Sequence, residues 1–250
     1  MNTPLVSVVM PAYNAEKYIE KAIESVLCQT SISYELIIII DGSSDNTASI
    51  LKRYRDHEAI TIIENERNIG VAASRNKGIA MAKGKYIAFL DTDDWWTSDK
   101  LERQVALIEE KHCVLTYTAR ELFDDNGNPT GNTIPVREEI SYEALVKHNI
   151  INCSSVLMET AVAREFYMEH DDSHEDYLMW LKVLKKYKIA YGINEPLLKY
   201  RLSTHGKSRN KLKSAKMNYK VHRYLGTNPV KSFAYMSSQM LHATFKYLNI

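Results

Sequence analysis

The sequence predicts an α/β fold with a mostly parallel sheet flanked by helices, followed by a C-terminal helical extension. Short apolar runs alternate with amphipathic segments through the first half of the chain, as is typical of strands buried between two helical layers. Polar or acidic side chains directly follow several of these runs, and such strand ends bind ligands in open α/β sheets. The chain has 250 residues, 45% of them apolar, which suits one large domain or one domain with an appendage.

The first half is expected to contain strands and helices in strict alternation. The first helix carries apolar side chains three and four positions apart, and Asn14 is its candidate N-terminal cap. The second strand is wholly apolar, and Gly84 ends the third helix. The expected strands are residues 5–10, 35–40, 60–63 and 86–90, and the expected helices are residues 16–29, 46–54 and 71–82.

The pattern changes in the second half. Ser98 is the expected cap of a helix that ends near Lys111, and residues 124–129 form a strong turn signal. Short strands and helices mix between residues 134 and 165. Further strands are expected at residues 114–119, 189–193 and 197–201, and further helices at residues 175–186, at 209–224 and, after the break at Asn228 and Pro229, to the end. We therefore expect residues 206–250 to be a basic helical extension of a unit formed by residues 1–205.

Charge is distributed unevenly along the chain. The net charge is only +1, but residues 196–250 contain eleven Lys and Arg and no Asp or Glu. Residues 1–195 therefore carry 21 basic and 31 acidic side chains, a net charge of −10. This asymmetry predicts that the basic tail meets an anionic surface or ligand. Nucleic acid is the less favoured partner, because no nucleic-acid-binding signature accompanies the charge.

The cysteines and the apolar runs indicate where the protein works. Cys28, Cys113 and Cys153 are widely spaced, odd in number and without a metal-ligand pattern, which predicts a reducing compartment such as the cytoplasm. The N-terminal residues lack a basic region followed by a long apolar one, so no signal peptide is expected. No apolar run approaches the roughly 20 residues that a membrane-spanning helix needs.

The most informative segment is the acidic cluster after the fourth expected strand. Asp91, Asp93 and Asp94 lie within four residues, directly after the apolar residues 86–90. Packed carboxylates repel one another and lose hydration, and a divalent cation removes that objection. Oxygen ligands suit Mg²⁺ or Mn²⁺, and Mg²⁺ often takes one or two carboxylates together with substrate phosphates. A solvated acidic loop is the alternative.

Three other element ends are candidates for binding a nucleotide. Residues 11–14, Pro-Ala-Tyr-Asn, follow the first strand and could hold a flat base, or they form only a helix-entry turn. Asp41 follows the second strand, where Gly42 permits a tight turn and leaves Asp41 to accept hydrogen bonds from a base or ribose; a plain turn is the alternative. Residues 68–76 open the third helix, and its N-terminus together with Arg75 favours phosphate. Neither a P-loop nor a dinucleotide fingerprint is present.

A second acidic segment lies far downstream. Residues 170–176, His-Asp-Asp-Ser-His-Glu-Asp, are dense in titratable groups and immediately precede an amphipathic helix. One interpretation is that this segment supplies a general base. The alternative is that carboxylates at a helix start only complement the helix dipole.

Taken together, these motifs resemble those of the inverting glycosyltransferases of family 2, which have the GT-A fold. The matching segments are Val6-Ser-Val-Val-Met-Pro-Ala-Tyr-Asn14, Asp41-Gly-Ser-Ser-Asp-Asn-Thr47, residues 70–76, Leu90-Asp-Thr-Asp-Asp94 and Glu175-Asp176. Their order and spacing fit over residues 4–205. Each motif is weak alone, but five in order are specific for the family, though not for a substrate.

The resemblance implies a role for each segment. Asp176 would be the catalytic base, with Glu175 beside it. Ile40 stands where many relatives have an acid, so we expect only Asp41 to act at that strand end. His205 would approach the diphosphate or the metal, unless it is an ordinary loop histidine. The residues expected at the nucleotide are Pro11, Ala12, Tyr13, Asn14, Asp41, Gly42, Arg75, Asp91, Thr92 and Asp93, and those expected at Mn²⁺ or Mg²⁺ are Asp93, Asp94 and His205.

The implied reaction is the transfer of a sugar from a nucleoside diphosphate, preferably UDP, to a hydroxyl of a glycan. The metal would neutralise the leaving diphosphate, and Asp176 would take the proton of the attacking hydroxyl. The basic tail suits a lipid-linked acceptor at the inner face of the plasma membrane, so peripheral membrane association is expected. One face of the last helix is apolar and either meets that membrane or packs on the catalytic domain; it comprises Val230, Phe233, Met240, Leu241, Phe245 and Leu248.

Two other classes of function compete with this interpretation. A sugar nucleotidyltransferase would normally have a Gly-rich, basic loop near the N-terminus, which residues 10–20 lack. A non-catalytic module that binds a sugar or nucleotide would not need all five motifs. Turnover distinguishes such a module from an enzyme.

Overall fold

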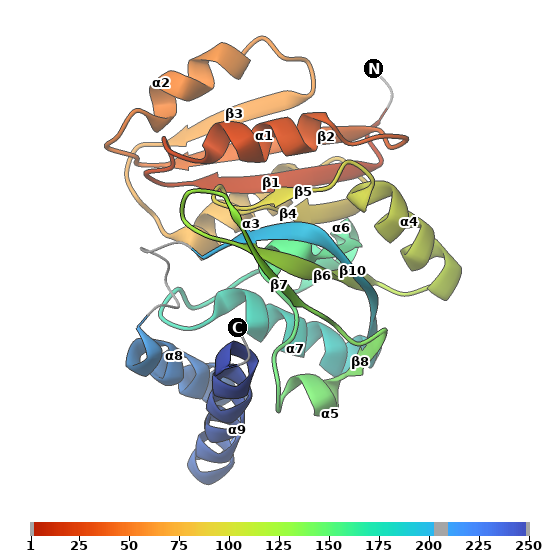
Figure 1. The fold of residues 1–250 in the computed structure, drawn as a ribbon, viewed down its shortest axis with the longest axis vertical. Coiled ribbons are helices and arrows are strands. Elements are labelled where there is room, and N and C mark those ends of the chain that lie inside the picture. Colours follow the sequence, from red (N-terminus) through yellow and green to blue (C-terminus); the bar gives the residue numbers. More distant parts are fainter. Residues whose placement is uncertain (1–2, 203–209, 249–250) are drawn as a thin grey trace.

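A computed structural model describes residues 3–202 and 210–248, with the backbone alone described for residues 243–248. The strands are β1 (Val6–Ala12), β2 (Tyr34–Asp41), β3 (Ile60–Asn65), β4 (Tyr86–Phe89), β5 (Trp95–Trp96), β6 (Leu115–Phe123), β7 (Pro129–Ile134), β8 (Glu139–Ser141), β9 (Leu157–Glu159) and β10 (Ile189–Arg201). They form one sheet of order β3-β2-β1-β4-β9-β6-β10-β5, with β7 paired to β6 and β8 paired to β10 (Figure 1).

The sheet has a parallel half and a mixed half. Strands β3, β2, β1 and β4 are parallel neighbours, as the alternation of apolar strands and helices predicts. In the other half β9 runs antiparallel to both β4 and β6, whereas β6 and β10 are parallel. The predicted α/β fold is confirmed, and its parallel character belongs mainly to the N-terminal half.

Helices cover both faces of the sheet. They are α1 (Ile19–Leu27), α2 (Thr47–Leu51), α3 (Val71–Met81), α4 (Lys100–Lys111), α5 (Tyr142–Leu145), α6 (Thr160–Glu165), α7 (Glu175–Tyr187), α8 (Lys211–Tyr224) and α9 (Pro229–Leu248). Successive side chains of β2 enter opposite cores because side chains alternate across a strand. Ile37 and Ile39 pack on the side of α3 and α7. Leu36, Ile38 and Ile40 pack on the side of α1 and α4.

The helix starts differ from the expected caps. Helix α1 begins at Ile19, and Asn14 does not cap it, since its side-chain oxygen accepts hydrogen bonds from the backbone N–H (2.9 Å) and hydroxyl of Ser44 instead. Helix α4 follows Asp99 rather than Ser98. The Asn14 side chain is taken up by a contact 30 positions away that the local sequence does not reveal.

The two strands expected at residues 189–193 and 197–201 are one strand, β10. Its pairing with β6 shifts register between Ile193 and Leu198, around Pro196. Proline cannot donate to the ladder, which explains the break in the pattern without ending the strand.

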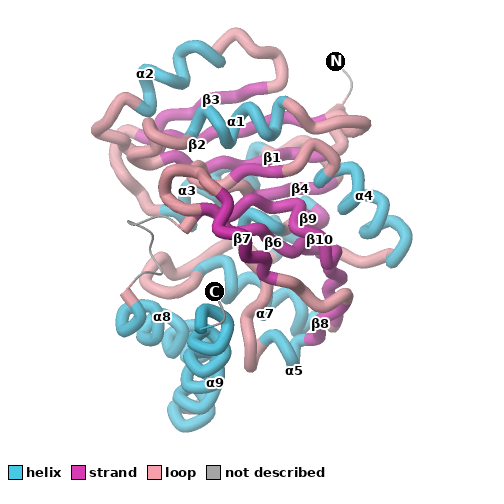
Figure 2. Tube along the Cα trace, in the orientation of Figure 1, coloured by secondary structure: helices cyan, strands magenta, loops and turns pink. Residues whose placement is uncertain are grey.

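The C-terminal helices α8 and α9 pack beside α7, at the end of the molecule opposite α1 and α2 (Figures 1 and 2). His222 of α8 lies between two tyrosines, with ring-centroid distances of 6.1 Å to Tyr177 and 5.0 Å to Tyr235. The side-chain amide of Gln239 donates to the hydroxyl of Tyr177 at 2.7 Å. Among the described residues no helix combines the length and the apolar character needed to cross a membrane.

Candidate active site

A pocket of about 540 Å³ opens where β1, β2 and β4 end. Most of the predicted site residues line it: Pro11, Ala12, Tyr13, Asp41, Arg75, Asp91, Thr92, Asp93, Glu175 and Asp176. Three predicted residues, Asn14, Gly42 and Asp94, are not part of this lining. His205 lies outside the described residues. The fold thus gathers predicted residues from positions 11 to 176 around one cavity.

Asp41 has more partners within the protein than the sequence suggests. It is 3% exposed, and one carboxylate oxygen accepts hydrogen bonds from the Asn65 amide and the Ile69 N–H, both at 2.9 Å. The other oxygen accepts from the Gly70 N–H at 3.0 Å. Asp41 therefore fixes the loop that leads into α3, and only its remaining lone-pair capacity faces the pocket.

Gly42 packs closely against the backbone of this loop. Its φ of +65° is the left-handed conformation that glycine adopts readily. A Cβ placed on Gly42 would lie 2.5 Å from the backbone nitrogen of Asn68, which itself lines the pocket. The close approach of these two loops is possible only because position 42 has no side chain.

The acidic cluster divides its members between the pocket and the interior. Asp91 and Asp93 line the pocket. Asp94 is 2% exposed, and its carboxylate accepts a hydrogen bond from the Arg201 N–H at 3.1 Å. Asp93 is therefore better placed than Asp94 to meet a ligand.

The carboxylates at the pocket fit a divalent cation shared with a ligand. Burial and the charge of Asp91 raise the pKa of Asp93 to about 6. A cation beside Asp93 would offset both causes, and the oxygen-only donors suit Mg²⁺ or Mn²⁺. Within the described part of the chain, no three His, Cys, Asp or Glu side chains group to hold a metal alone. Phosphate oxygens of a substrate would have to complete the coordination, as is common for Mg²⁺.

Arg75 links the acidic cluster to the second acidic segment. Its guanidinium is buried, and one terminal nitrogen lies 2.5 Å from a carboxylate oxygen of Asp91. The other donates to Glu175 at 2.9 Å and contacts the Met168 sulfur at 3.9 Å. Arg75 lines the pocket as predicted, but a phosphate would have to compete with two carboxylates for it.

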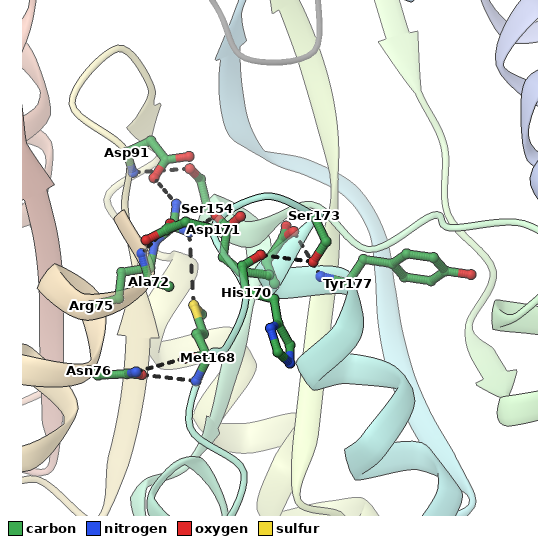
Figure 3. Close-up of polar contacts among 12 residues, drawn as sticks. Ala72, Arg75, Asn76, Asp91, Ser154, Met168, His170, Asp171, Ser173 and Tyr177 are labelled. Atoms are coloured by element: carbon green, nitrogen blue, oxygen red, sulfur yellow. Dashed lines mark hydrogen bonds and ion pairs between the residues drawn. The ribbon is translucent and has the colours of Figure 1, made fainter. Parts of the chain in front are cut away.

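The N-terminus of α3 is also occupied by carboxylates. The Ala72 N–H donates to Asp171 at 3.0 Å (Figure 3). The Gly70 N–H donates to Asp41. A Cβ on Gly70 would lie 2.1 Å from a carboxylate oxygen of Asp171. The anion preference of a helix N-terminus is thus met by the protein's own acids.

Helix α3 fixes the loop that precedes α7. The side-chain amide of Asn76 donates to the Met168 carbonyl at 2.7 Å and accepts from the Met168 N–H at 2.9 Å, as Figure 3 shows. Arg75 and Asn76 follow Ala72 by three and four residues, so both lie on the same face of α3 as Ala72. We call these three residues the α3 clamp, because they hold Met168, Asp171 and Glu175.

Asp176 stands in the first turn of α7 and lines the pocket. Burial and then the adjacent Glu175 charge raise its pKa, while Arg75 and His174 act in the opposite sense. A raised pKa makes the carboxylate a stronger proton acceptor than an ordinary Asp. The arrangement can therefore activate a hydroxyl that enters the pocket.

Sequence reasoning missed several parts of the lining. Asn152, Cys153 and Tyr200 face the pocket. Asn152 and Cys153 belong to a short 3₁₀ turn in which Asn152 accepts a hydrogen bond from the Ser154 N–H at 3.0 Å. They lie in a region of short mixed elements, where no periodic pattern marks a strand end, so no sequence signal could have found them.

Comparisons with known proteins agree with this geometry. The family model described as Glycosyl transferase family 2 matches residues 7–164. TuaG of Bacillus subtilis (strain 168), whose name assigns it to teichuronic acid biosynthesis, is 40% identical over 221 residues, 88% of this chain and 88% of its own length. WfgD of Escherichia coli, a UDP-Glc:alpha-D-GlcNAc-diphosphoundecaprenol beta-1,3-glucosyltransferase, is 35% identical over 238 residues, 94% of this chain and 92% of its own length.

Solved structures share the fold. TarS 1–349 of S. aureus in complex with UDP-GlcNAc has a TM-score of 0.76 at 20% identity, covering 97% of this chain and 73% of TarS 1–349. The mannosyltransferase PcManGT of Pyrobaculum calidifontis, in complex with GDP-Man and Mn²⁺, has a TM-score of 0.71 at 16% identity, covering 96% of this chain and 70% of PcManGT. At these identities the likeness concerns the fold.

The fold is therefore that of a GT-A glycosyltransferase, with its pocket at the ends of the parallel strands. The chain belongs to glycosyltransferase family 2 and is a glycosyltransferase, as its motifs predict.

Proposed function

We propose that the protein transfers a sugar from a UDP-sugar to a hydroxyl of a lipid-linked glycan, with inversion at the anomeric carbon, in the synthesis of a cell-surface polysaccharide. One observation carries the proposal. Asp93 and Asp176 line the same pocket. One pocket can therefore hold the donor diphosphate near Asp93 and the acceptor hydroxyl near Asp176. The names of TuaG and WfgD support the choice of polysaccharide synthesis and of a diphosphate-linked lipid acceptor.

The donor would lie along the ends of the parallel strands. Tyr13, which is 55% exposed at the pocket, offers a ring face to the base, and Asp41 offers its remaining acceptor capacity. Asp93, together with Asp91, would hold Mn²⁺ or Mg²⁺, which when bound supplies a Lewis acid that neutralises the leaving diphosphate. The buried Asp94 would not contact the ligand and would instead support the site by holding the Arg201 backbone.

Asp176 would act as the general base. It would accept the proton of the acceptor hydroxyl as the oxygen attacks the anomeric carbon from the face opposite the leaving diphosphate. The C–O bond to the diphosphate breaks as the new glycosidic bond forms, which inverts the centre in one displacement. Its raised pKa favours this proton transfer.

Arg75 would position both halves of this machinery. It joins Asp91, beside the expected diphosphate, to Glu175, beside the base. A planar guanidinium holds two carboxylates at fixed angles more firmly than a lysine could. We therefore assign it a positioning role in addition to the predicted contact with nucleotide.

The location follows from the acceptor. A lipid-linked glycan lies in a membrane, and the donor nucleotide sugar is made in the cytoplasm, so we propose a cytoplasmic enzyme held peripherally at the inner face of the plasma membrane. In this proposal residues 1–205 form the catalytic unit and residues 206–250 the extension that meets the membrane.

Calorimetric titration of UDP, GDP, dTDP and CDP, with and without Mn²⁺, tests the donor class. We expect metal-dependent binding of UDP that Asp93→Ala abolishes while the protein stays folded by circular dichroism. Absence of binding for all four nucleotides, in a folded sample, would contradict the proposal. Nucleotide binding with no transfer to any acceptor would favour the non-catalytic binding module.

A further inference from the structure

Several of the described apolar side chains of helix α9 point to solvent. Val230, Phe233 and Leu241 are 80%, 61% and 61% exposed, and Met240 is 40% exposed. Phe233, the exposed Ala234, Met240 and Leu241 follow Val230 by three, four, ten and eleven positions, which places all five residues on one side of a helix. We call this set of five residues the α9 stripe.

The face of α9 that turns toward the protein combines polar and apolar side chains, since Tyr235 and Met236 are half-buried there beside Ser232 and Gln239. Ser232 is fully buried and Gln239 is 6% exposed. The Gln239 side chain donates to the Tyr177 hydroxyl and accepts from the Asn149 N–H at 2.8 Å. A helix of an isolated soluble domain normally buries its apolar side. In α9 four large apolar side chains are left outside this packing, and an exposed apolar patch marks an interaction site.

Exposed positive charge lies on α8, which packs against α9, and at the start of α9 itself. The cationic residues of α8 and α9 that are exposed are Lys211, Lys213, Lys216, Arg223 and Lys231. Leu212, which is 81% exposed, lies among them. Since the chain has no Asp or Glu after Glu195, this segment presents one sign of charge only. Basic residues beside an amphipathic helix are typical of a surface that binds anionic lipid.

Helix α8 also connects this surface to the pocket. The Tyr224 ring stacks on His170 with a centroid distance of 3.6 Å, and its hydroxyl lies 3.0 Å from Asp172. The His174 ring lies 3.1 Å from the Ser214 hydroxyl. His174 lines the pocket, so the basic helix rests against the loop that borders the proposed acceptor side.

We propose that the α9 stripe and the flanking cations of α8 dock the protein on an anionic lipid bilayer, with the pocket held beside the membrane surface. The choice of a membrane as the meeting place with the acceptor rests on the proposed function. The choice of lipid over a second copy of the chain rests on charge, because two such surfaces would bring like charges together.

Vesicle co-sedimentation of the full chain tests the proposal. The vesicles contain phosphatidylcholine alone or with phosphatidylglycerol, at low and high salt. We expect binding that requires phosphatidylglycerol and weakens with salt. The variant Phe233→Ser/Leu241→Ser should lower the partition coefficient about tenfold or more. The variant Lys213→Glu/Lys216→Glu should lower it by at least about tenfold and reduce the salt dependence.

Matched controls use exposed residues away from this surface. Met81→Ser removes a 41% exposed side chain of α3, and Lys52→Glu/Lys185→Glu reverses two exposed lysines elsewhere. Both controls should bind vesicles as the wild type does. Equal losses in the controls, or wild-type binding that ignores phosphatidylglycerol and salt, would overturn the proposal.

Two further measurements separate docking from catalysis and from self-association. UDP titration of the stripe variant should match the wild type, because the stripe lies outside the pocket lining; loss of UDP affinity with the stripe would overturn a pure docking role. Sedimentation velocity without lipid should give a monomer. A wild-type dimer that Phe233→Ser/Leu241→Ser converts to monomer would assign the stripe to a second copy instead. Vesicle binding without UDP binding would leave docking intact and reject the proposed function.

Discussion

At the scale of single residues, the surroundings of Asp176 make transfer dependent on pH. Burial and the charge of Glu175 raise the pKa of Asp176, and the base must be ionised to act. The rate should therefore fall on the acidic side through a pKa above the ordinary value of about 3.9. Glu175→Gln removes the charge that raises this pKa and leaves Arg75, which lowers it, so the acidic limb should move to lower pH.

The pH profile of kcat for the wild type and Glu175→Gln checks this prediction. Glu169→Gln is the control, because Glu169 is an exposed acid of the same loop and pairs with Lys182. Its profile should match that of the wild type. A limb that stays in place, or moves to higher pH, in Glu175→Gln would contradict the assigned cause of the shift.

Arg75 gives a second prediction at this scale, one that concerns stability. Arg75→Met leaves the carboxylates of Asp91 and Glu175 without their shared cation, and loss of one partner of a buried ion pair costs about 3–5 kcal/mol. Arg75→Met/Glu175→Gln removes one of the stranded charges and should recover part of that loss. Urea unfolding measures both free energies of unfolding.

The control for Arg75 is an arginine in an exposed pair. Arg103→Met breaks the pair with Glu195, whose side chain is 56% exposed, and should cost less than about 1 kcal/mol. If Arg75→Met costs no more than Arg103→Met, the buried bridge does not hold the site together.

At the scale of elements, the α3 clamp transmits the position of one helix to another. Asn76→Ala removes both side-chain hydrogen bonds to the Met168 backbone and should cost about 1–3 kcal/mol of stability. The loop before α7 then loses one anchor, so kcat should fall severalfold while UDP affinity is retained. Hydrogen exchange in residues 168–174 should become faster.

Asn126→Ala, in the exposed turn between β6 and β7, is the matched control and should leave kcat and hydrogen exchange unchanged. Equal loss of UDP affinity and kcat in Asn76→Ala would point to a general loosening of the donor pocket. An unchanged kcat would contradict the claim that the α3 clamp positions the catalytic loop.

The elements also show where sequence reasoning works. The strand ends at Asp41 and Asp91 were predictable, because apolar runs stop at polar residues and parallel strands bring those ends to one edge. The failure of Asn14 as a helix cap was not predictable, since its side chain accepts a hydrogen bond from Ser44, about 30 positions away. The interruption near Pro196 was predictable, but whether the chain continues as one strand on both sides of it depends on pairing with β6.

The α3 clamp lay beyond prediction for a similar reason. The sequence offers a helix N-terminus and an arginine, which favour phosphate equally well in isolation. Only the tertiary fold brings Asp171 and Glu175 onto that helix, about 100 positions along the chain. Local motifs therefore identify which residues reach the site, and the fold decides which partner each one has.

At the scale of the whole molecule, His222 lies where the C-terminal helices meet α7, and its burial makes the folded protein less stable at acidic pH. It is fully buried, burial lowers its pKa to about 4, and neither ring nitrogen has a hydrogen-bond partner among the described residues. The unfolded chain binds a proton at the ordinary value of about 6.5. Stability contributed by the neutral ring is therefore complete above about pH 6.5 and is lost as pH falls toward 4.

His222→Phe should reduce this acid sensitivity. Urea unfolding at neutral and mildly acidic pH should show a smaller decrease in stability for His222→Phe than for the wild type. His57→Phe, at an exposed position, should keep the wild-type decrease. An unchanged decrease in His222→Phe would mean that other groups cause the loss of stability.

The C-terminal segment was the least predictable part, because its orientation depends on packing against the rest of the molecule. The apolar face of α9 could equally have been a core face by its periodicity. The structure turns Val230, Phe233 and Leu241 outward and places Gln239 inward, and no local pattern distinguishes these two orientations.

The central claim is that one pocket holds the donor and supplies Asp176 as the base. The most direct measurement compares wild type and Asp176→Asn for sugar transfer from UDP-sugar to a lipid-linked acceptor and, in the same preparations, for UDP affinity by calorimetry. We predict that Asp176→Asn lowers transfer by about 100-fold or more while UDP affinity is unchanged. Loss of both together would mean that Asp176 is structural, and retained transfer would mean that the base lies elsewhere.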